Sequence, residues 1–167
     1  MAEFDPVRLL RTLTDHEVRF IVIGGIAARL RGAPLLTEDI DITPDRSADN
    51  LERIAAALRR LDARLRTPSE PDGVAFPIEA EMLAVNQSWT LTTAAGDLDL
   101  VFSPAGTSGY DDLARSASGL AITDEGDLIV QVAALADIIR SKEAAGRDKD
   151  RAALPLLRRT LEETTGT

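Results

Sequence analysis

The chain has 167 residues, which is enough to bury one good core, so we expect a single compact unit. It contains no cysteine and one histidine, which excludes disulfides, thiolate metal sites and multi-histidine sites and leaves mainly oxygen ligands for any metal. The net charge of −9 argues against a general electrostatic grip on long nucleic acid. No signal peptide or bilayer-spanning stretch is evident, so a cytoplasmic protein without a membrane partner is expected.

The first half of the chain reads as two strand-helix units preceded by a helix. Apolar spacing and capping residues predict these elements: a helix over 6–14, a strand over 20–23, a short helix over 26–31, a strand over 37–42 and a helix over 47–61. Gly24 and Gly25 separate the first strand from the short helix.

The second half begins with a turn-rich segment over 67–77, interpreted as a loop. The elements predicted after it are a hairpin of strands over 89–93 and 97–102, a short helix after 110, strands near 120–122 and 128–130, and helices over about 133–145 and 149–163. Pro155 predicts a kink or a late start in the last helix. We therefore expect a core over 1–130 and a C-terminal helical pair over 131–167 that packs on it.

Two acidic residues lie on one face of a predicted strand. Side chains alternate along a strand, so Asp39 and Asp41 point the same way, with Cβ atoms roughly 6 to 7 Å apart. At an effective dielectric constant near 20, two such charges repel by about 2.5 kcal/mol, so a positive group is expected between them. Asp99 on a second strand offers a third carboxylate, and Asp97, beside the turn at Gly96, is the alternative. Three oxygen ligands suit Mg²⁺.

Gly24 and Gly25 lie where a strand leads into a helix. Glycine there lets a phosphate approach backbone N–H groups at the positive end of the helix dipole, although the same pair also forms simple tight turns.

The combination of Gly24-Gly25, Asp39-Ile-Asp41 and Leu98-Asp99-Leu100 resembles the signature of the DNA polymerase beta nucleotidyltransferase superfamily. The resemblance implies an α/β (α+β) fold with a small mixed β-sheet, flanking helices and a C-terminal helical pair. It also implies that the glycines hold a triphosphate, and that Asp39, Asp41 and Asp99 bind two Mg²⁺ ions, or Mn²⁺, for in-line transfer of a nucleotidyl group.

Charged residues occupy inward positions in the C-terminal helices. Lys142 lies on the apolar stripe of the first helix and so needs an anionic partner, and Asp150 begins the stripe of the second, where a simple contact with the helix dipole is the alternative. Basic residues also crowd this region, either facing phosphates or covering a solvated helix surface: Arg140, Lys142, Arg147, Lys149, Arg151, Arg158 and Arg159.

The run from Ser141 to Asp150 resembles the lysine-to-aspartate motif of the AbiEii-like branch, which includes toxins of toxin-antitoxin systems, although Ala153 replaces an acid common there. By this resemblance, Lys142 would neutralise triphosphate charge, and Asp150 would position Lys142 or orient the acceptor hydroxyl. The implied partners are a nucleoside triphosphate, an acceptor hydroxyl on RNA such as a tRNA end or on protein, and a cognate antitoxin.

Two other functions compete with this hypothesis. The run from Asp39 to Thr43 also fits the Asp-x-Asp-x-Thr motif of haloacid dehalogenase-like phosphatases, in which Asp39 would be phosphorylated, but that motif normally ends a strongly apolar strand. The chain could also be a nucleotidyltransferase fold without turnover that serves as a binding module.

Overall fold

A computed structural model describes residues 2–166; residues 1 and 167, the outer limits of the two predicted segments, lie outside the described residues. The helices are α1 (Pro6–Asp15), α2 (Gly24–Leu30), α3 (Ala48–Arg60), α4 (Ala80–Leu83), α5 (Tyr110–Ala114), α6 (Leu135–Ala145) and α7 (Asp148–Thr165). The strands are β1 (Phe20–Ile23), β2 (Asp39–Pro44), β3 (Arg64–Thr67), β4 (Glu70–Val74), β5 (Ser88–Thr93), β6 (Gly96–Val101), β7 (Ser118–Ala121) and β8 (Ile129–Val132).

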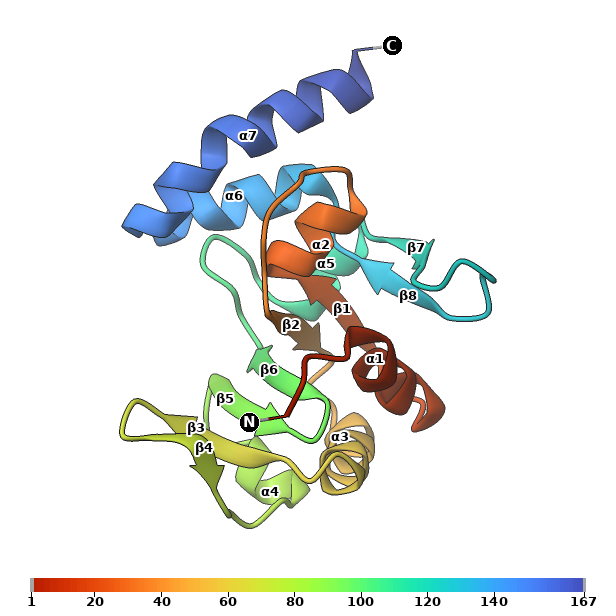
Figure 1. Ribbon diagram of the computed structural model, residues 1–167, viewed down its shortest axis with the longest axis vertical. Coiled ribbons are helices and arrows are strands. Elements are labelled where there is room, and N and C mark those ends of the chain that lie inside the picture. The colour runs from red at the N-terminus through yellow and green to blue at the C-terminus, as the bar shows by residue number, and fades with distance from the viewer. Residues whose placement is uncertain (1, 167) are drawn as a thin grey trace.

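All eight strands form one sheet in the order β4-β3-β5-β6-β2-β1-β8-β7 (Figure 1). The sheet is mixed, because β2 runs parallel to β6 and β1 parallel to β8, whereas the other neighbours are antiparallel. The predicted fold class, an α/β protein with a mixed sheet, flanking helices and a C-terminal helical pair, is confirmed.

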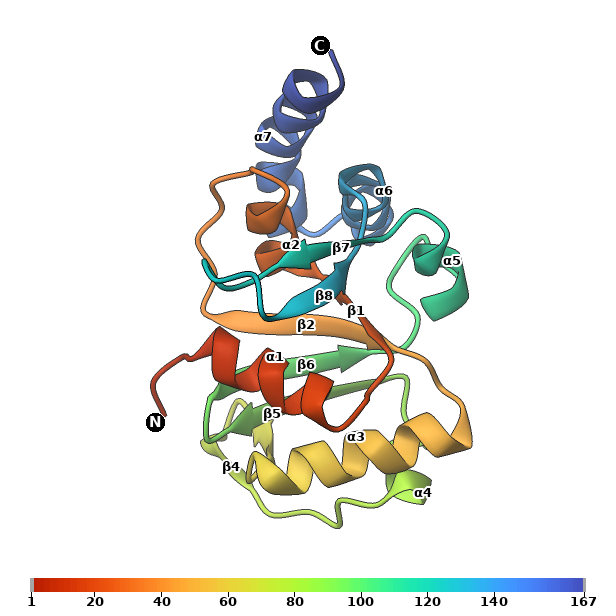
Figure 2. The ribbon, with the colours of Figure 1, turned by 90° about the vertical axis from the view of Figure 1, so that its right-hand side faces the viewer.

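One part of the core lies between one face of the sheet and the helices α1 and α3, which run side by side in Figure 2, and buried residues of α2, α6 and α7 extend it. Alternation along β2 places Ile40 and Ile42 on the buried face, and Leu98 and Leu100 do the same on β6; all four side chains are fully buried. The residues between them therefore point to the opposite face. Near that face α2, α6 and α7 gather at one end of the molecule, and the C-terminal part of α7 extends beyond the other elements (Figures 1 and 2).

The segment over 67–77, predicted as a loop, instead contains β4, which pairs with β3 at the edge of the sheet. An edge strand tolerates Pro71 because one side of its backbone makes no ladder hydrogen bonds. Gly73, at φ +85°, has no room for a side chain, since a Cβ there would lie 2.6 Å from the Cβ of Arg64. Proline and glycine were therefore misleading as loop signals here.

Three smaller differences concern helices. The short helix α4 was not predicted, and α2 begins at Gly24, directly where β1 ends, instead of at residue 26. The last helix starts at Asp148, close to the predicted residue 149, and contains Pro155, so of the two effects expected from this proline the late start is wrong. Within residues 2–166, no helix combines the length and the apolar character needed to cross a bilayer.

Candidate active site

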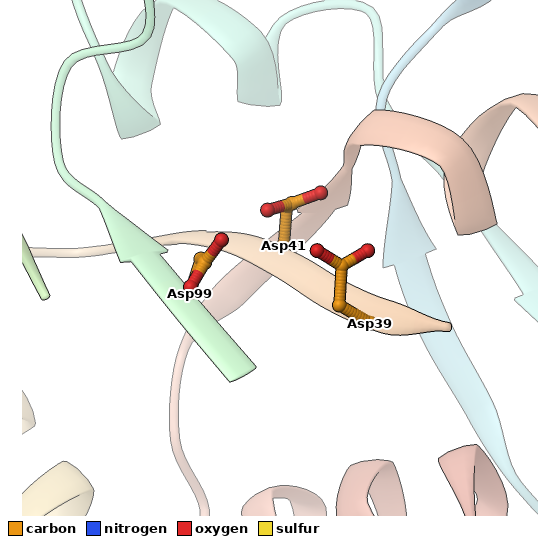
Figure 3. Close-up of side chains that lie close together, drawn as sticks. All are labelled: Asp39, Asp41 and Asp99. Carbon is orange, nitrogen blue, oxygen red and sulfur yellow. The ribbon is translucent and has the colours of Figure 1, made fainter. Parts of the chain in front are cut away.

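Three carboxylates meet on the face of the sheet opposite α1 and α3 (Figure 3). Because β2 and β6 are parallel neighbours, Asp41 lies directly opposite Asp99, and Asp39 precedes Asp41 on the same face. One oxygen from each of these residues lies within 4.8 Å of the others. Asp97 is opposite Asp39 but is not part of this group, so Asp99 is the third acid.

The cluster concentrates negative charge in a partly buried place. Burial, together with the charges of Asp39 and Asp99, raises the pKa of Asp41 to about 7. Burial and the charge of Asp39 also raise the pKa of Asp99. The Oδ1 atom of Asp99 is buried and has no hydrogen-bond partner among the described residues. An all-carboxylate set with a buried free oxygen fits a hard divalent cation such as Mg²⁺ or Mn²⁺.

Asp39 is held by a neighbour on its own segment. The Thr37 hydroxyl donates a hydrogen bond to Asp39 Oδ1 at 2.8 Å. Sequence reasoning missed this role of Thr37. Thr37 thus fixes the orientation of one of the three carboxylates.

The two glycines at the start of α2 bring the backbone close to the acidic cluster. Gly24 has φ +69°, and a Cβ there would lie 3.0 Å from the Cγ of Asp41. A Cβ on Gly25 would lie 2.9 Å from the Cβ of Thr37. Any side chain at either position would therefore push against a residue of the acidic site, which is a steric reason for glycine at both.

The C-terminal pair of charged residues is also assembled. Asp150 is fully buried, accepts a hydrogen bond from Arg147 Nε at 2.7 Å and lies 3.5 Å from Lys142 Nζ. It also accepts from the backbone N–H of Arg147, so it caps α7 in addition to facing inward. Burial opposes its ionisation, but Arg147 and Lys142 together hold the pKa of Asp150 below its usual range.

Lys142 links this pair to the acidic cluster, because its charge acts on Asp41 and opposes the rise in pKa that burial causes there. Sequence reasoning missed the specific role of Arg147, which appeared only within the basic cluster. Its i,i+3 spacing to Asp150 is the signal that could have found it.

Most of the basic cluster is neutralised by acids. Arg140 pairs with Asp112 and Asp137 at 3.2 and 3.1 Å. Further pairs join Arg151 to Asp148 and Arg158 to Glu143. These contacts favour an ion-paired helix surface over a continuous phosphate-facing patch.

Arg66, which sequence reasoning did not single out, reaches the cluster from β3. Its Nη2 lies 3.6 Å from Asp99 Oδ1, and its Nε lies 3.5 Å from Asp97 Oδ2. Arg66 also lines an open hollow of about 440 Å³ beside the acids, together with Leu36, Thr37, Glu38, Asp39 and Asp97. Leu36 is 98% exposed at this hollow, so an unburied apolar side chain adjoins the acidic site.

No protein-family model matches the sequence, and no curated protein sequence matches it. Solved structures do resemble the fold. The lincosamide antibiotic adenylyltransferase LnuA, in its lincomycin-bound form, has a TM-score of 0.59 at 14% identity, over 93% of this chain and 98% of its own. The antibiotic-resistance factor ANT(2'')-Ia has a TM-score of 0.58 at 14% identity, over 92% and 80% of the two chains.

A candidate nucleotidyltransferase from Thermotoga maritima gives a TM-score of 0.55 at 17% identity, over 97% of both chains. The chain therefore has the fold found in nucleotidyltransferases. At these identities the likeness concerns the fold, and the activity has to be argued from the site.

Proposed function

We propose that this protein is a metal-dependent nucleotidyltransferase that moves a nucleotidyl group from a nucleoside triphosphate to an acceptor hydroxyl. The observation that carries the proposal is the convergence of Asp39, Asp41 and Asp99 to within 4.8 Å on one face of the sheet. The superfamily resemblance implies two divalent ions. When bound, they would stabilise charge on the entering and leaving oxygens of an in-line transfer. The three aspartates would hold those ions.

The remaining residues of the site would bind and orient the triphosphate. Gly24 and Gly25 let the start of α2 pack directly against Asp41 and Thr37, which brings its backbone beside the acidic cluster, where the triphosphate would bind. Lys142, within electrostatic reach of Asp41, would balance triphosphate charge. Asp150 would hold Lys142 in place through the contact at 3.5 Å. These roles follow the arrangement around the acidic cluster and the superfamily resemblance.

The acceptor follows from the resemblance to the AbiEii-like branch. On that basis the hydroxyl belongs to RNA, such as a tRNA end, or to a protein, and the chain acts as the toxin of a toxin-antitoxin pair with a cognate antitoxin. The assembled contact between Lys142 and Asp150 supports this proposal, because these residues carry the motif. The ion-paired basic cluster gives it little further support.

A small-molecule acceptor is the second candidate, and two observations favour it. The hollow of about 440 Å³ beside the acids has the size of a small-ligand pocket. LnuA, which shares the fold, is an antibiotic adenylyltransferase seen with lincomycin bound.

The phosphatase alternative does not match the structure. Asp39 is the first residue of β2, whereas the phosphatase motif normally ends a strongly apolar strand. A binding module without turnover would bind metal and triphosphate but transfer no nucleotide, so a transfer assay distinguishes it from an active nucleotidyltransferase.

The test is transfer of label from each of the four α-³²P nucleoside triphosphates, with Mg²⁺ or Mn²⁺, into total RNA, total protein and a panel of small hydroxyl-bearing antibiotics. Asp41→Asn should abolish transfer, while Asp72→Asn, at an exposed position on β4, should leave it unchanged. Label in one pool identifies the nucleotide and the acceptor class together. Binding of metal and triphosphate without any transfer would instead favour the binding module.

A further inference from the structure

Arg66 ends a row of polar side chains that crosses four strands. Asp41 lies opposite Asp99, and Asp99 lies opposite Thr90 on β5. On the next strand Leu65 lies opposite Leu91, so the same antiparallel register places Arg66 opposite Thr90. The row therefore runs from Asp41 on β2 across β6 and β5 to Arg66 on β3, whereas Gly24 lies on the opposite side of β2, next to β1.

The contacts of Arg66 are close but incomplete. Its distances of 3.6 Å to Asp99 Oδ1 and 3.5 Å to Asp97 Oδ2 allow strong electrostatic attraction but exceed good hydrogen-bond lengths. Both Arg66 Nε and Asp99 Oδ1 are buried without a hydrogen-bond partner among residues 2–166. Leaving a buried charged group unsatisfied is costly, so this arrangement points to a further partner for Asp99.

Asp97 gives Arg66 a second anion that is not part of the metal group. It pairs with Arg66 Nε, while Asp99 faces Asp39 and Asp41. The guanidinium can therefore keep one carboxylate partner when the other turns toward a cation, because its nitrogens form a planar fork with several donors.

We propose that Arg66 is a positioning residue for Asp99 and the counter-charge that a divalent cation replaces. Arg66 holds the Asp99 carboxylate beside Asp41 and offsets the repulsion within the cluster. A bound cation takes over that charge, and Arg66 then remains with Asp97. The cation and Arg66 thus compete for Asp99. The metal site in this inference is that of the proposed function, but the competition is measured without nucleotide.

The first test is Mn²⁺ binding to the full-length protein without nucleotide, followed by electron paramagnetic resonance. Arg66→Gln, which keeps the stem and removes the charge, should tighten Mn²⁺ binding by about 10-fold, because unit charges this close interact strongly even at an effective dielectric near 20. Arg66→Lys should restore affinity toward that of the wild type. Arg64→Gln, two residues earlier on β3 with its guanidinium donating to the carbonyl of Gly73, is the matched control and should not change affinity.

The second test separates this role from simple packing. In EDTA at pH 8, Arg66→Gln should lower the Tm because the acids repel without compensation, and saturating Mg²⁺ should remove most of that difference. A purely structural Arg66 would give the same loss of Tm in both conditions. Unchanged or weaker Mn²⁺ binding in Arg66→Gln, or a wild type that binds no Mn²⁺, overturns the inference. Competition without any nucleotidyl transfer supports it while rejecting the proposed function.

Discussion

Asp41 is the residue in which the opposing demands on the site are clearest. It is held beside two other carboxylates by strand pairing and is removed from water by the surrounding elements, so its charged form is disfavoured. A protein keeps such a group at a cost in stability when the group serves a site instead of the fold. The clustered acids therefore predict a folded state that is stabilised by divalent cations.

The raised pKa of Asp41 predicts a pH dependence of stability. Its pKa is about 7 in the folded protein and near 3.8 in the unfolded chain, so the folded state binds more protons between these values. The contribution of Asp41 to stability is therefore fully present below about pH 4 and is lost as the pH rises to 7. Asp41→Asn should be more stable than the wild type by about 0.5–2 kcal/mol at pH 8 in EDTA and similar at pH 4.

Urea unfolding at the two pH values, with EDTA or with Mg²⁺, measures this difference. Because cations compete with protons for carboxylates, Mg²⁺ should stabilise the wild type more at pH 8 than at pH 5. Asp72→Asn is the control for general charge. A wild type that is as stable as Asp41→Asn at pH 8 in EDTA would contradict the expected electrostatic cost.

At the scale of elements, the C-terminal helices depend on a buried anion. Asp150 caps α7 and binds Arg147, and it also faces Lys142 across the turn between α6 and α7. One carboxylate thus fixes the start of one helix and the orientation of a lysine on the other.

Asp150→Asn should lower the free energy of unfolding by about 1–3 kcal/mol, because the hydrogen bonds of a buried carboxylate to charged donors are weakened. Since the pKa of Asp150 lies below its usual range, its stabilisation is present above the unfolded pKa and is lost as the pH falls through the folded value. The difference between variant and wild type should therefore shrink in acid.

Chemical denaturation at pH 7 and at pH 3 checks both statements. Asp148→Asn is the matched control two residues earlier, because that side chain is 98% exposed and should change stability by less than about 0.5 kcal/mol. Equal effects of the two substitutions would show that Asp150 acts only as a surface charge.

At the scale of the whole molecule, segments far apart in sequence are joined near the site. The guanidinium of Arg31, just after α2, donates to the carbonyls of Val132 and Ala133, at the end of β8 and before α6. It also donates to the hydroxyl of Ser118 on β7. Arg31 therefore connects the end of α2 to β7 and to the end of β8.

Arg31→Ala should lower the free energy of unfolding by about 1–3 kcal/mol, because two carbonyls lose a charged donor. The substitution should increase the rate of amide hydrogen exchange more in β7 and β8 than in β5 and β6, since the lost contacts lie at the β7 edge of the sheet. Arg29→Ala, at an exposed position on α2, should change neither measurement. Uniformly faster exchange across the whole sheet would contradict a local connection.

Sequence periodicity predicted the positions of some site residues but not of all. Alternation around Asp39 and Asp41 predicted their shared face, and the spacing of the C-terminal stripes predicted that Lys142 and Asp150 turn inward. These predictions succeeded because each depends on the geometry of a single element. The choice between Asp97 and Asp99 needed the register of β6 against β2, which joins residues almost 60 positions apart. The functional roles of these residues stay predictions.

The sequence by itself determined the strands and helices that carry the acids, the mainly oxygen-based chemistry of any metal site and the class of fold. Only the tertiary structure decided that Asp99 completes the cluster, that Arg66 reaches it from β3, and that most of the basic cluster is ion-paired. The physical reason is that periodicity and capping are local, whereas strand order, register and ion pairs between elements depend on the packing of the whole chain.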